Sequence, residues 1–487
     1  MVSLVNKLRL LKVPDKEVDR FVPPVTKGAP TQSDIARYRY LSGPNLGGLF
    51  VNERWIDDTL YKENSEGSSE LSALESWTSG STPTTEELAA MKTKWENHWD
   101  TFITEKDWEY MKSKDVTSIR LPIGFWCLPD PGRFSKTTPF EPYVSVYENC
   151  WTYVEKIIDA AMRYEITVVL DLHVLQAGAL LEKSAGIEID EGHLIRRKKL
   201  KDLSVETAVA AAECAVKKPN VIALQLLNEA SFAQVGLNEF YRECLIKIGK
   251  ILTNEYLQIV ISDAWDPNKW GEYDNLILDS HIYRAATSRY KQMSAKEHIK
   301  YALSCVKPVK NTDVIVGEWA PVLEGDSAND DVLALQVEYG KNLVECFSRL
   351  AGNFFWTFKF KGDGGAWDFR KMADKGVYVK SLDPSKVPES AKDEAYATAK
   401  TTYQTKRQRF HKDAVFNEES FHAGFDQGWE DSIAFAKFNG SRIGRLNTWS
   451  VLRYLQHTDD RTSPLEESDY FDGLSSASRA YTEAASN

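Results

Sequence analysis

The 487-residue sequence lacks the features that mark several classes of protein. Its six cysteines are scattered without CxxC spacing, which argues against a structural zinc site. A chain of this length needs no disulfide framework, so we expect reduced thiols in an intracellular protein. There is no run of about eighteen apolar residues, so no transmembrane helix is expected.

Positive charge is in the minority. The sequence has 60 Lys and Arg against 71 Asp and Glu, a formal net charge of −11 at pH 7. An acidic surface repels phosphate groups, which argues against nucleic acid or an anionic membrane as the main partner. The basic run RRKKLK at 196–201 is too short to change that balance.

The N-terminal stretch does not resemble a secretory signal. Residues 1–21, MVSLVNKLRLLKVPDKEVDRF, contain no long apolar core followed by a small-residue cleavage site. We therefore expect a cytoplasmic protein. Leu4, Leu8 and Leu11 would share one face of a short basic amphipathic helix. Such a helix leaves two interpretations open, a docking helix or a weak attachment to a membrane or organelle.

Short apolar runs alternate with longer helical patterns from about residue 44 onward. Helical patterns include 141–164, 237–254 and 330–350. Eight such repeats predict an α/β fold, a (β/α)8 TIM barrel, and leave a doubly wound open sheet as the alternative. No Gly-rich phosphate-binding turn follows any strand, which favours the barrel. Several runs are apolar throughout, as in parallel strands buried on both faces. The predicted strands are 45–51, 117–124, 166–173, 221–229, 257–263, 275–281, 313–319 and 352–358.

The same patterns divide the chain into three parts. Residues 1–35 would form an N-terminal extension and residues 36–400 the barrel. The long first connection, 52–112, would decorate the barrel mouth. Residues 401–487 would form a helical C-terminal extension packed on the barrel, with a partly disordered tail from about Asp459, where the sequence is charged and Ser-rich.

Polar and aromatic side chains stand at the ends of the predicted strands. In a barrel of this kind the C-terminal strand ends meet at one rim, where active sites lie. Taken singly, each side chain has a structural explanation, such as a hydrogen-bonded histidine or a core tryptophan. Their occurrence at equivalent positions of several strands indicates one shared site. Its candidates are Arg120, Asp171, His173, Asn228, Glu229, His281, Tyr283, Glu318, Trp319 and Trp356.

The paired glutamates Glu229 and Glu318 indicate the chemistry. They end strands four and seven, so they are expected to face each other across the mouth. Glycoside hydrolysis needs one protonated carboxyl for the leaving oxygen and one ionised carboxylate to attack the anomeric carbon. A carboxyl at the edge of a low-dielectric cleft, beside a second carboxylate, has a raised pKa. The pattern therefore predicts that Glu229 stays protonated and acts as the acid.

Four neighbours would support the two glutamates. Asn228 would hold the sugar 2-hydroxyl. Arg120 would keep Glu318 ionised through a charge-assisted bond, and Tyr283 would hydrogen-bond the same carboxylate. Trp356 would stack beneath the sugar ring.

These residues resemble a known signature. Residues Arg120, His173, Asn228, Glu229, His281, Tyr283, Glu318 and Trp356 resemble the eight-residue signature of glycoside hydrolase family 5. Longer stretches are similar to its fungal exo-β-1,3-glucanase branch, in an intracellular subgroup. They are GPNLGGLFVNERW (43–55), HWDTFITEKDWEYMKSKDVTSIRLPIGFW (98–126) and VIALQLLNEA (221–230), and the resemblance covers about residues 40–370.

The resemblance implies a retaining, double-displacement hydrolase of terminal β-linked glucose, with Glu229 as acid/base and Glu318 as nucleophile. It implies neither cofactor nor metal, and a monomer is expected. A β-glucoside or β-glucan would be the substrate. The substrate-binding residues that the resemblance implies are Glu53, Arg120, His173, Asn228, His281, Tyr283 and Trp356.

Two departures from the family pattern keep alternatives open. After His173 the sequence reads HVLQAGALLEKSAG where the family has a Gly/Pro turn, and Arg54 follows Glu53 where the family has proline. A β-glucosidase acting on glycolipids or sterol glucosides, or a catalytically weak carbohydrate-binding barrel, therefore stand beside the glucanase hypothesis. A metal-dependent hydrolase on the same barrel is disfavoured because the sequence lacks the HxH and carboxylate clusters it needs.

Overall fold

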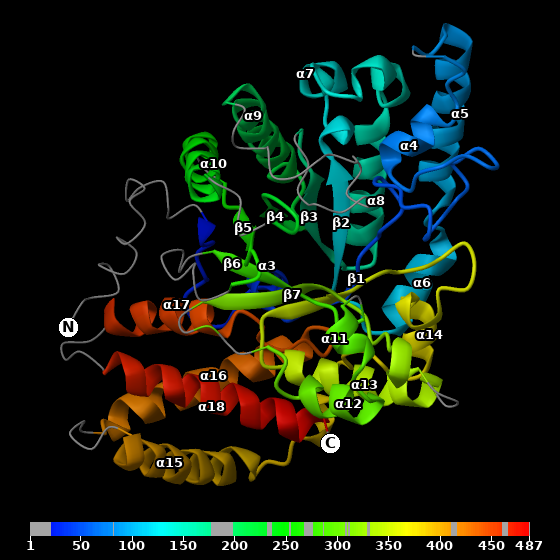
Figure 1. Ribbon diagram of the computed structural model, residues 1–487. Coiled ribbons are helices and arrows are strands. Elements are labelled where there is room, and N and C mark those ends of the chain that lie inside the picture. Colours follow the sequence, from blue (N-terminus) through cyan, green and yellow to red (C-terminus); the bar gives the residue numbers. More distant parts are fainter. Residues whose placement is uncertain are drawn as a thin grey trace.

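Eight parallel strands form the centre of the computed structural model (Figure 1). The structure describes residues 21–80, 82–176, 198–230, 236–252, 255–266, 276–285, 287–306, 309, 312–328, 332–410, 416–459 and 466–486. The strands are β1 (Leu41–Pro44), β2 (Ser118–Gly124), β3 (Thr167–Val174), β4 (Val221–Gln225), β5 (Gln258–Ser262), β6 (Ile277–Ile282), β7 (Asp313–Trp319) and β8 (Gly352–Phe355).

The strands close into a barrel. Hydrogen-bonded neighbours follow the order β1-β8-β7-β6-β5-β4-β3-β2, and every ladder is parallel. The ring closes between β1 and β2, where Asn45 and Arg120 form a parallel bridge and the Leu46 N–H donates to the Arg120 carbonyl at 3.0 Å. The predicted (β/α)8 barrel is confirmed, and the doubly wound alternative is wrong.

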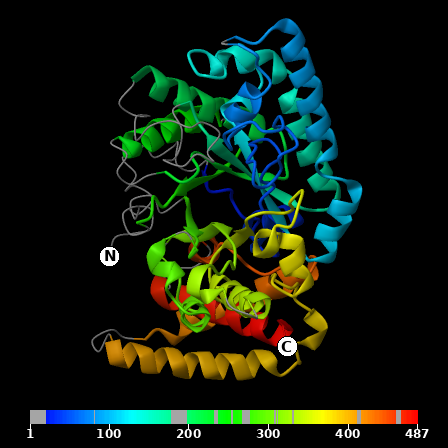
Figure 2. The same ribbon diagram turned by 45° about the vertical axis from the view of Figure 1, so that its right-hand side comes forward.

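The barrel interior is filled by apolar side chains. Strand residues point alternately inward and outward, and outward ones such as Ile119 and Leu170 share one apolar cluster with residues of the helices. Helices surround the strands (Figures 1 and 2). The inner cluster consists of Leu41, Val169, Ile222, Ala223, Val260, Ile277, Ile315, Ala351 and Phe354. The helices that follow the strands include α8 (Cys150–Arg163), α9 (Lys198–Ala215), α10 (Leu237–Ile251), α11 (Ser288–Lys291), α12 (Ala295–Ala302), α13 (Val332–Phe347) and α14 (Phe369–Asp374).

The first connection of the barrel holds several helices. Between β1 and β2 lie α4 (Glu70–Glu75), α5 (Thr85–Thr101) and α6 (Glu105–Ser113), with α5 standing along one side of the barrel (Figure 2). After β2 come α7 (Pro131–Ser135) and the 3-10 helices η3 (Phe125–Cys127) and η4 (Glu141–Val146). The sequence predicts one helix over 141–164, but η4 and α8 divide that range.

The first predicted strand, 45–51, is wrong. The strand is β1 at Leu41–Pro44, and the apolar run after it is a buried loop in which Gly48 has φ 78°. Gly43 lies so close to β2 that a Cβ would stand 2.0 Å from the Ser118 carbonyl oxygen. A strand that needs glycine for close packing carries little apolar signal, so the adjoining apolar loop was the stronger pattern.

The C-terminal helices cover the end of the barrel opposite its mouth. They are α15 (Ala391–Phe410), α16 (Glu418–Lys437), α17 (Leu446–Asp459) and α18 (Glu467–Ser486), with η8 (Pro384–Lys386) before them (Figure 1). The buried Arg445 donates to Asp313, the first residue of β7, and to Gln258, the first residue of β5. The predicted boundary at 400/401 falls inside α15.

The prediction of a partly disordered tail is wrong for Glu467–Ser486. These residues form α18, which packs on α16 with Tyr470 and Leu474 fully buried. Glycines permit this close approach: a Cβ on Gly424 would lie 2.0 Å from the Tyr470 carbonyl oxygen. Small residues at helix contacts produce a weak hydrophobic pattern, so the sequence of this segment resembles that of a solvent-exposed tail.

The short helix α3 (Gln32–Tyr38) precedes β1, and η6 (Gly325–Ser327) and η7 (Gly365–Trp367) lie in the loops after β7 and β8. The predicted amphipathic helix in residues 1–20 lies outside the described residues. Among the residues that are described, no helix is both long and apolar enough to cross a membrane.

We predict that Asp313→Ala destabilises the whole fold. The carboxylate of Asp313 accepts bonds from Arg445 Nε (3.1 Å), the Asn447 N–H (3.2 Å) and the Thr448 N–H (3.3 Å) at the start of α17. Its removal leaves a buried guanidinium without its counter-charge, which typically costs about 3–5 kcal/mol. Chemical denaturation monitored by circular dichroism measures the loss.

Asp100→Ala is the matched control. Asp100 pairs with Lys156 at 3.0 Å, but both side chains are more than half exposed. Exposed pairs contribute about 0–1 kcal/mol, so this variant should unfold close to wild type. Equal destabilisation by the two variants would show that the Arg445 contact does not fasten the extension.

Candidate active site

Nine of the residues predicted for the site lie at the mouth of the barrel, and Asp171 lies beside them as a partner of Arg120. The expectation for Trp319 is wrong: its ring packs on Phe347 and Phe355 in the core. Hydrogen bonds, ring contacts and electrostatic interactions link the nine into one cluster, which also includes side chains that were not predicted. The nine are Glu53, Arg120, His173, Asn228, Glu229, His281, Tyr283, Glu318 and Trp356.

Glu229 and Glu318 come close together. One carboxylate oxygen of each, together with a ring nitrogen of His281, lie within 4.8 Å of one another. Glycosidases in which one carboxylate attacks the sugar directly hold the two carboxyl groups roughly 5–5.5 Å apart, whereas those that place a water between them need roughly 6.5–9.5 Å. The spacing here suits direct attack.

Glu318 is surrounded by donors. Arg120 Nη1 donates to its Oε1 at 3.0 Å, and the Tyr283 hydroxyl donates to its Oε2 at 2.9 Å. His281 Nδ1 lies 3.5 Å from Oε2. Burial raises the pKa of Glu318, and the charge of Glu229 adds to that, while the positive charges of His281 and Arg120 oppose it. The carboxylate is thus fixed in orientation with both oxygens bonded.

Arg120 is a fully buried cation that lies beneath the mouth and bonds to several of its residues. Its Nη2 lies 3.0 Å from Asp171 Oδ2 and donates to Asn228 Oδ1 at 2.6 Å. Nε donates to Gln225 Oε1 at 2.9 Å, and Nη1 also donates to Asn45 Oδ1 at 2.8 Å. Although burial opposes it, the carboxylates of Asp171 and Glu318 raise the pKa of Arg120 further. Every side of the guanidinium therefore holds a residue of the barrel mouth in place.

Glu229 belongs to a chain of three titratable groups. His281 Nδ1 lies 2.7 Å from Glu229 Oε1, and His281 Nε2 lies 3.1 Å from the buried Asp279 Oδ2. The charges of Glu318 and Asp279, and the bonds to Asp279 and Glu229, raise the pKa of His281 well above its usual 6.5 despite burial. Glu229 itself has φ 41°, so the turn that follows β4 holds it in a left-handed conformation.

The expected raised pKa of Glu229 is wrong for this arrangement. Burial acts in that direction, but the hydrogen bond and positive charge of His281 prevail and lower the pKa of Glu229. The sequence could not reveal this, because His281 stands on another strand, 52 residues away along the chain.

His173 lies on the other side of the mouth. Its Nδ1 lies 2.8 Å from Asp171 Oδ2, and its ring stacks on Trp356 with centroids 5.6 Å apart and planes at 10°. Its Nε2 lies 3.5 Å from Asn228 Nδ2. Although burial opposes it, the bond to Asp171 raises the pKa of His173. The altered loop after His173 lies, from residue 177 to 197, outside the described residues.

Glu53 lies in the first connection, at the rim of the mouth. It is buried, its Oε2 accepts from Trp55 Nε1 at 2.7 Å, and burial raises its pKa to about 7. Arg54, the residue that replaces the family proline, turns away: it donates to the Gly67 carbonyl at 3.1 Å and stacks over Tyr61 at 4.7 Å. The Arg54 side chain therefore bonds to residues of its own connection and not to Glu53.

Sequence reasoning missed three polar side chains of this site as functional candidates, Asn45, Gln225 and Asp279, and it did not identify the candidate Asp171 as a partner of Arg120. The signal that could have found Asp279 and the role of Asp171 is strand periodicity. Each stands two residues before a predicted histidine, so both side chains point to the same face of the strand.

Glu229, His281 and Glu318 could also surround a metal ion, since their ligand atoms lie within 4.8 Å of one another. The same atoms are engaged in bonds with each other and with Tyr283, Arg120 and Asp279. Their donor and acceptor pattern is complete as an acid–base site.

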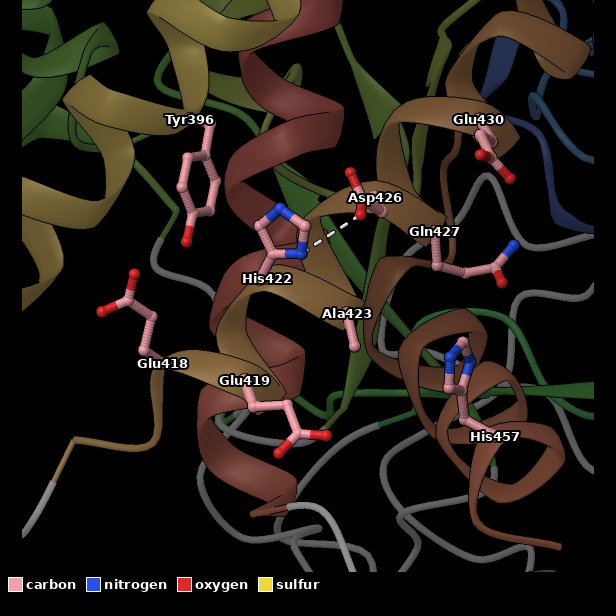
Figure 3. Close-up of a pocket in the computed structure, with 9 residues that line it drawn as sticks. All are labelled: Tyr396, Glu418, Glu419, His422, Ala423, Asp426, Gln427, Glu430 and His457. Carbon is pink, nitrogen blue, oxygen red and sulfur yellow. Dashed lines mark ion pairs between the residues drawn. The ribbon is translucent and has the colours of Figure 1, made fainter. Parts of the chain in front are cut away.

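A second hollow lies in the C-terminal extension. It measures about 510 Å³ and is shown in Figure 3. His422 pairs with Asp426 at 3.2 Å, and the carboxylates of Glu418 and Asp426 pair with Lys400 and Lys392. These are exposed ion pairs on α15 and α16, and they lack the buried, converging geometry of the barrel mouth.

Comparison with known proteins agrees with this geometry. The sequence matches the family model for Cellulase (glycosyl hydrolase family 5) over residues 78–361. An uncharacterised glycosyl hydrolase of Saccharomyces cerevisiae is 30% identical over 491 residues, covering 93% of this chain and 94% of the relative. A glucan 1,3-beta-glucosidase 3 of Schizosaccharomyces pombe is 28% identical, covering 92% and 96% of the two chains.

Among solved structures, the rutinosidase from Aspergillus niger shares the fold with a TM-score of 0.57 at 19% identity, covering 71% of this chain and 99% of that one. The family model spans more than half of the chain, and the yeast relative spans nearly all of it. The resemblance predicted from the sequence is thus confirmed: the protein belongs to glycosyl hydrolase family 5.

Proposed function

We propose that the protein is a retaining β-glucosidase of the exo-β-1,3-glucanase type, which removes terminal β-linked glucose. The observation that carries the proposal is the close approach of Glu229 and Glu318, with Arg120 and Tyr283 donating to one and His281 bonded to the other. The glucan 1,3-beta-glucosidases similar to this chain support the substrate class.

In the first step, ionised Glu318 attacks the anomeric carbon while Glu229 donates a proton to the glycosidic oxygen. The carbon–oxygen bond to the leaving group breaks, and a glycosyl ester forms on Glu318. In the second step, Glu229 takes a proton from water, the water oxygen attacks the anomeric carbon, and Glu318 leaves as a carboxylate. Both inversions at carbon together retain the β configuration.

The proton for the leaving group is held jointly by Glu229 and His281. The raised pKa of His281 keeps one proton on this pair at neutral pH. Across their 2.7 Å contact, that proton sits on the imidazole or on the carboxyl, and the two forms have the same total charge. When a glycosidic oxygen approaches Glu229, the carboxyl form supplies the acid, and His281 keeps its bond to Asp279.

The remaining residues bind the sugar. Trp356, held parallel to His173, would offer a stacking surface, and Asn228, held by Arg120, would bind the 2-hydroxyl. Glu53 would accept bonds from hydroxyls of the terminal glucose. These roles follow from the family resemblance and from the placement of the side chains around the two glutamates.

A β-glucosidase acting on glucosides of lipids or sterols is the second candidate. Two tryptophans near the mouth are unusually exposed: Trp55, at 45%, and Trp265, at 53%, just beyond the end of β5. Exposed apolar surface at a binding site favours an apolar leaving group. The third hypothesis, a weakly catalytic carbohydrate-binding barrel, predicts binding without turnover. Cytoplasmic location, a monomeric state and weak membrane association through residues 1–20 stay predictions from the sequence.

We predict that Glu318→Gln and Glu229→Gln separate the two roles on aryl β-glucosides. Loss of the nucleophile should lower kcat by about 10³-fold or more with every leaving group. Loss of the acid should cost about 10²–10⁴-fold with a poor leaving group, but much less with an activated one such as 2,4-dinitrophenolate. Steady-state kinetics across a leaving-group series provides the measurement.

The control for this series is Asp100→Asn, an exposed carboxylate on α5 that should leave the rates unchanged. Equal activity of wild type and both glutamine variants would eliminate the proposed roles.

A second prediction concerns pH. Glu318 must be ionised, and burial raises its pKa, so kcat/KM should rise through an acid limb that lies above pH 4.5, the ordinary value for Glu. Activity should fall again at high pH, when the proton shared by His281 and Glu229 is lost. Tyr283→Phe removes a donor to ionised Glu318, which raises the pKa of that carboxyl and moves the acid limb to higher pH. Tyr164→Phe, at a half-buried tyrosine far from the mouth that bonds to Glu105, should leave the limb in place.

The stereochemical outcome is a third prediction. Proton NMR during hydrolysis should show β-glucose first, with the α anomer appearing only by mutarotation. Initial release of α-glucose would contradict direct attack by Glu318. Comparing laminaribiose with a sterol β-glucoside as substrates distinguishes the two candidates: a higher kcat/KM for the lipid glucoside would favour the second.

A further inference from the structure

A buried carboxylate outside the catalytic pair, Glu70, gathers four hydrogen bonds. It begins α4 in the first connection of the barrel and is fully buried. Its Oε2 accepts from the backbone N–H of Asn52 at 2.8 Å and from Asn52 Nδ2 at 2.5 Å. Its Oε1 accepts from Trp95 Nε1 at 2.7 Å and from the hydroxyl of Tyr147. One side chain thus joins the Asn52 loop to α5 and to the residue that follows η4.

Glu70 has no cationic partner among the residues that the structure describes. Burial raises its pKa, and the four donors act against that shift. A buried carboxyl group is costly unless its bonds are satisfied. A hydrophobic side chain of similar size could fill the same space, so the carboxylate contributes something that packing alone does not. Two of its four bonds go to a single residue, Asn52.

Asn52 immediately precedes Glu53, the residue expected to bind sugar hydroxyls. The charges of His173, Glu318 and Glu229 act on the carboxyl group of Glu53, so Glu53 lies within electrostatic reach of the catalytic pair. On the other side of Glu53, the Arg54 N–H donates to the carbonyl of Ser68, which lies just before Glu70, at 3.1 Å. The direction in which Glu53 points therefore depends on how firmly the peptide of Asn52 is held.

We propose that Glu70 is a positioning residue for sugar recognition: by fixing Asn52, it aims the Glu53 carboxylate at the hydroxyls of the terminal glucose. This inference rests on the proposed function of the barrel mouth. Small displacements of a binding group matter, since a misplacement of about 1 Å can cost about 10²-fold in rate. A purely structural role for Glu70 would instead affect stability without altering how tightly the sugar is held.

The test is a double-mutant cycle on an aryl β-glucoside, with Glu70→Gln, Glu53→Gln and both together. Glutamine keeps only one acceptor oxygen, so its amide nitrogen must face the donors of Asn52 or those of Trp95 and Tyr147, and the four-bond arrangement that fixes Asn52 is lost. Glu70→Gln should raise KM about tenfold with little change in kcat, because binding shared by ground state and transition state is lost. If Glu70 acts through Glu53, the double variant should have the KM of Glu53→Gln alone. Effects on KM that multiply, or a Glu70→Gln variant with lower Tm and unchanged KM, overturn the proposal.

Tyr147→Phe is the matched control. It removes one donor to Glu70 but leaves both bonds to Asn52, so it should lower Tm while KM stays at the wild-type value. If Glu70→Gln does not fold, Asn52→Ala takes its place in the cycle, since it removes only the 2.5 Å side-chain bond. In the Glu53→Gln background, Asn52→Ala should have no further effect on KM. Effects of the two substitutions on KM that multiply count against the proposal.

The proposed function can fail separately. If wild type hydrolyses no β-glucoside, the catalytic proposal falls, and the cycle is then measured as calorimetric binding of a glucose-configured iminosugar. Coupled losses of affinity in Glu70→Gln and Glu53→Gln would still support positioning. Independent losses, or no binding to wild type, would overturn it.

Discussion

The barrel mouth depends on one buried cation. Arg120 stands on β2 with no exposure to solvent, and its guanidinium contacts side chains from β3, β4, β7 and the loop after β1. A planar fork with five donors can satisfy several acceptors at once, which a lysine could not. By bonding Glu318, Asn228 and Asp171 together, Arg120 offsets the negative charge that the site concentrates and fixes the orientation of the groups that would contact the sugar.

A second electrostatic unit sits opposite Arg120. Asp279, His281 and Glu229 form a hydrogen-bonded chain, while Glu318 is bonded to Arg120 and Tyr283. The two glutamates thus differ through their partners more than through their burial. Asp279 connects the two units, because its Oδ2 also accepts a hydrogen bond from Gln225, which in turn accepts one from Arg120. Charge balance across the mouth is therefore shared by residues of five different strands and loops.

The rest of the fold supports this mouth from its base and from one side. The C-terminal helices attach at the opposite end, where Arg445 contacts the first residues of β5 and β7. The first connection builds one wall of the mouth, and Glu70 ties that wall to α5. Stability and recognition are thus divided between the two ends of the barrel, as is usual for this architecture.

The sequence by itself determined the barrel and most of the side chains that meet at its mouth. Buried parallel strands are apolar throughout, so seven of the strands could be predicted from the sequence. Polar groups at the C-terminal ends of these strands meet at one rim of the barrel. Tertiary structure decided the rest. The true first strand and α18 rely on glycines in close contact, which carry no hydrophobic signal. The protonation of Glu229 was set by His281, and a pKa depends on charges within a few ångströms, whatever their separation along the chain.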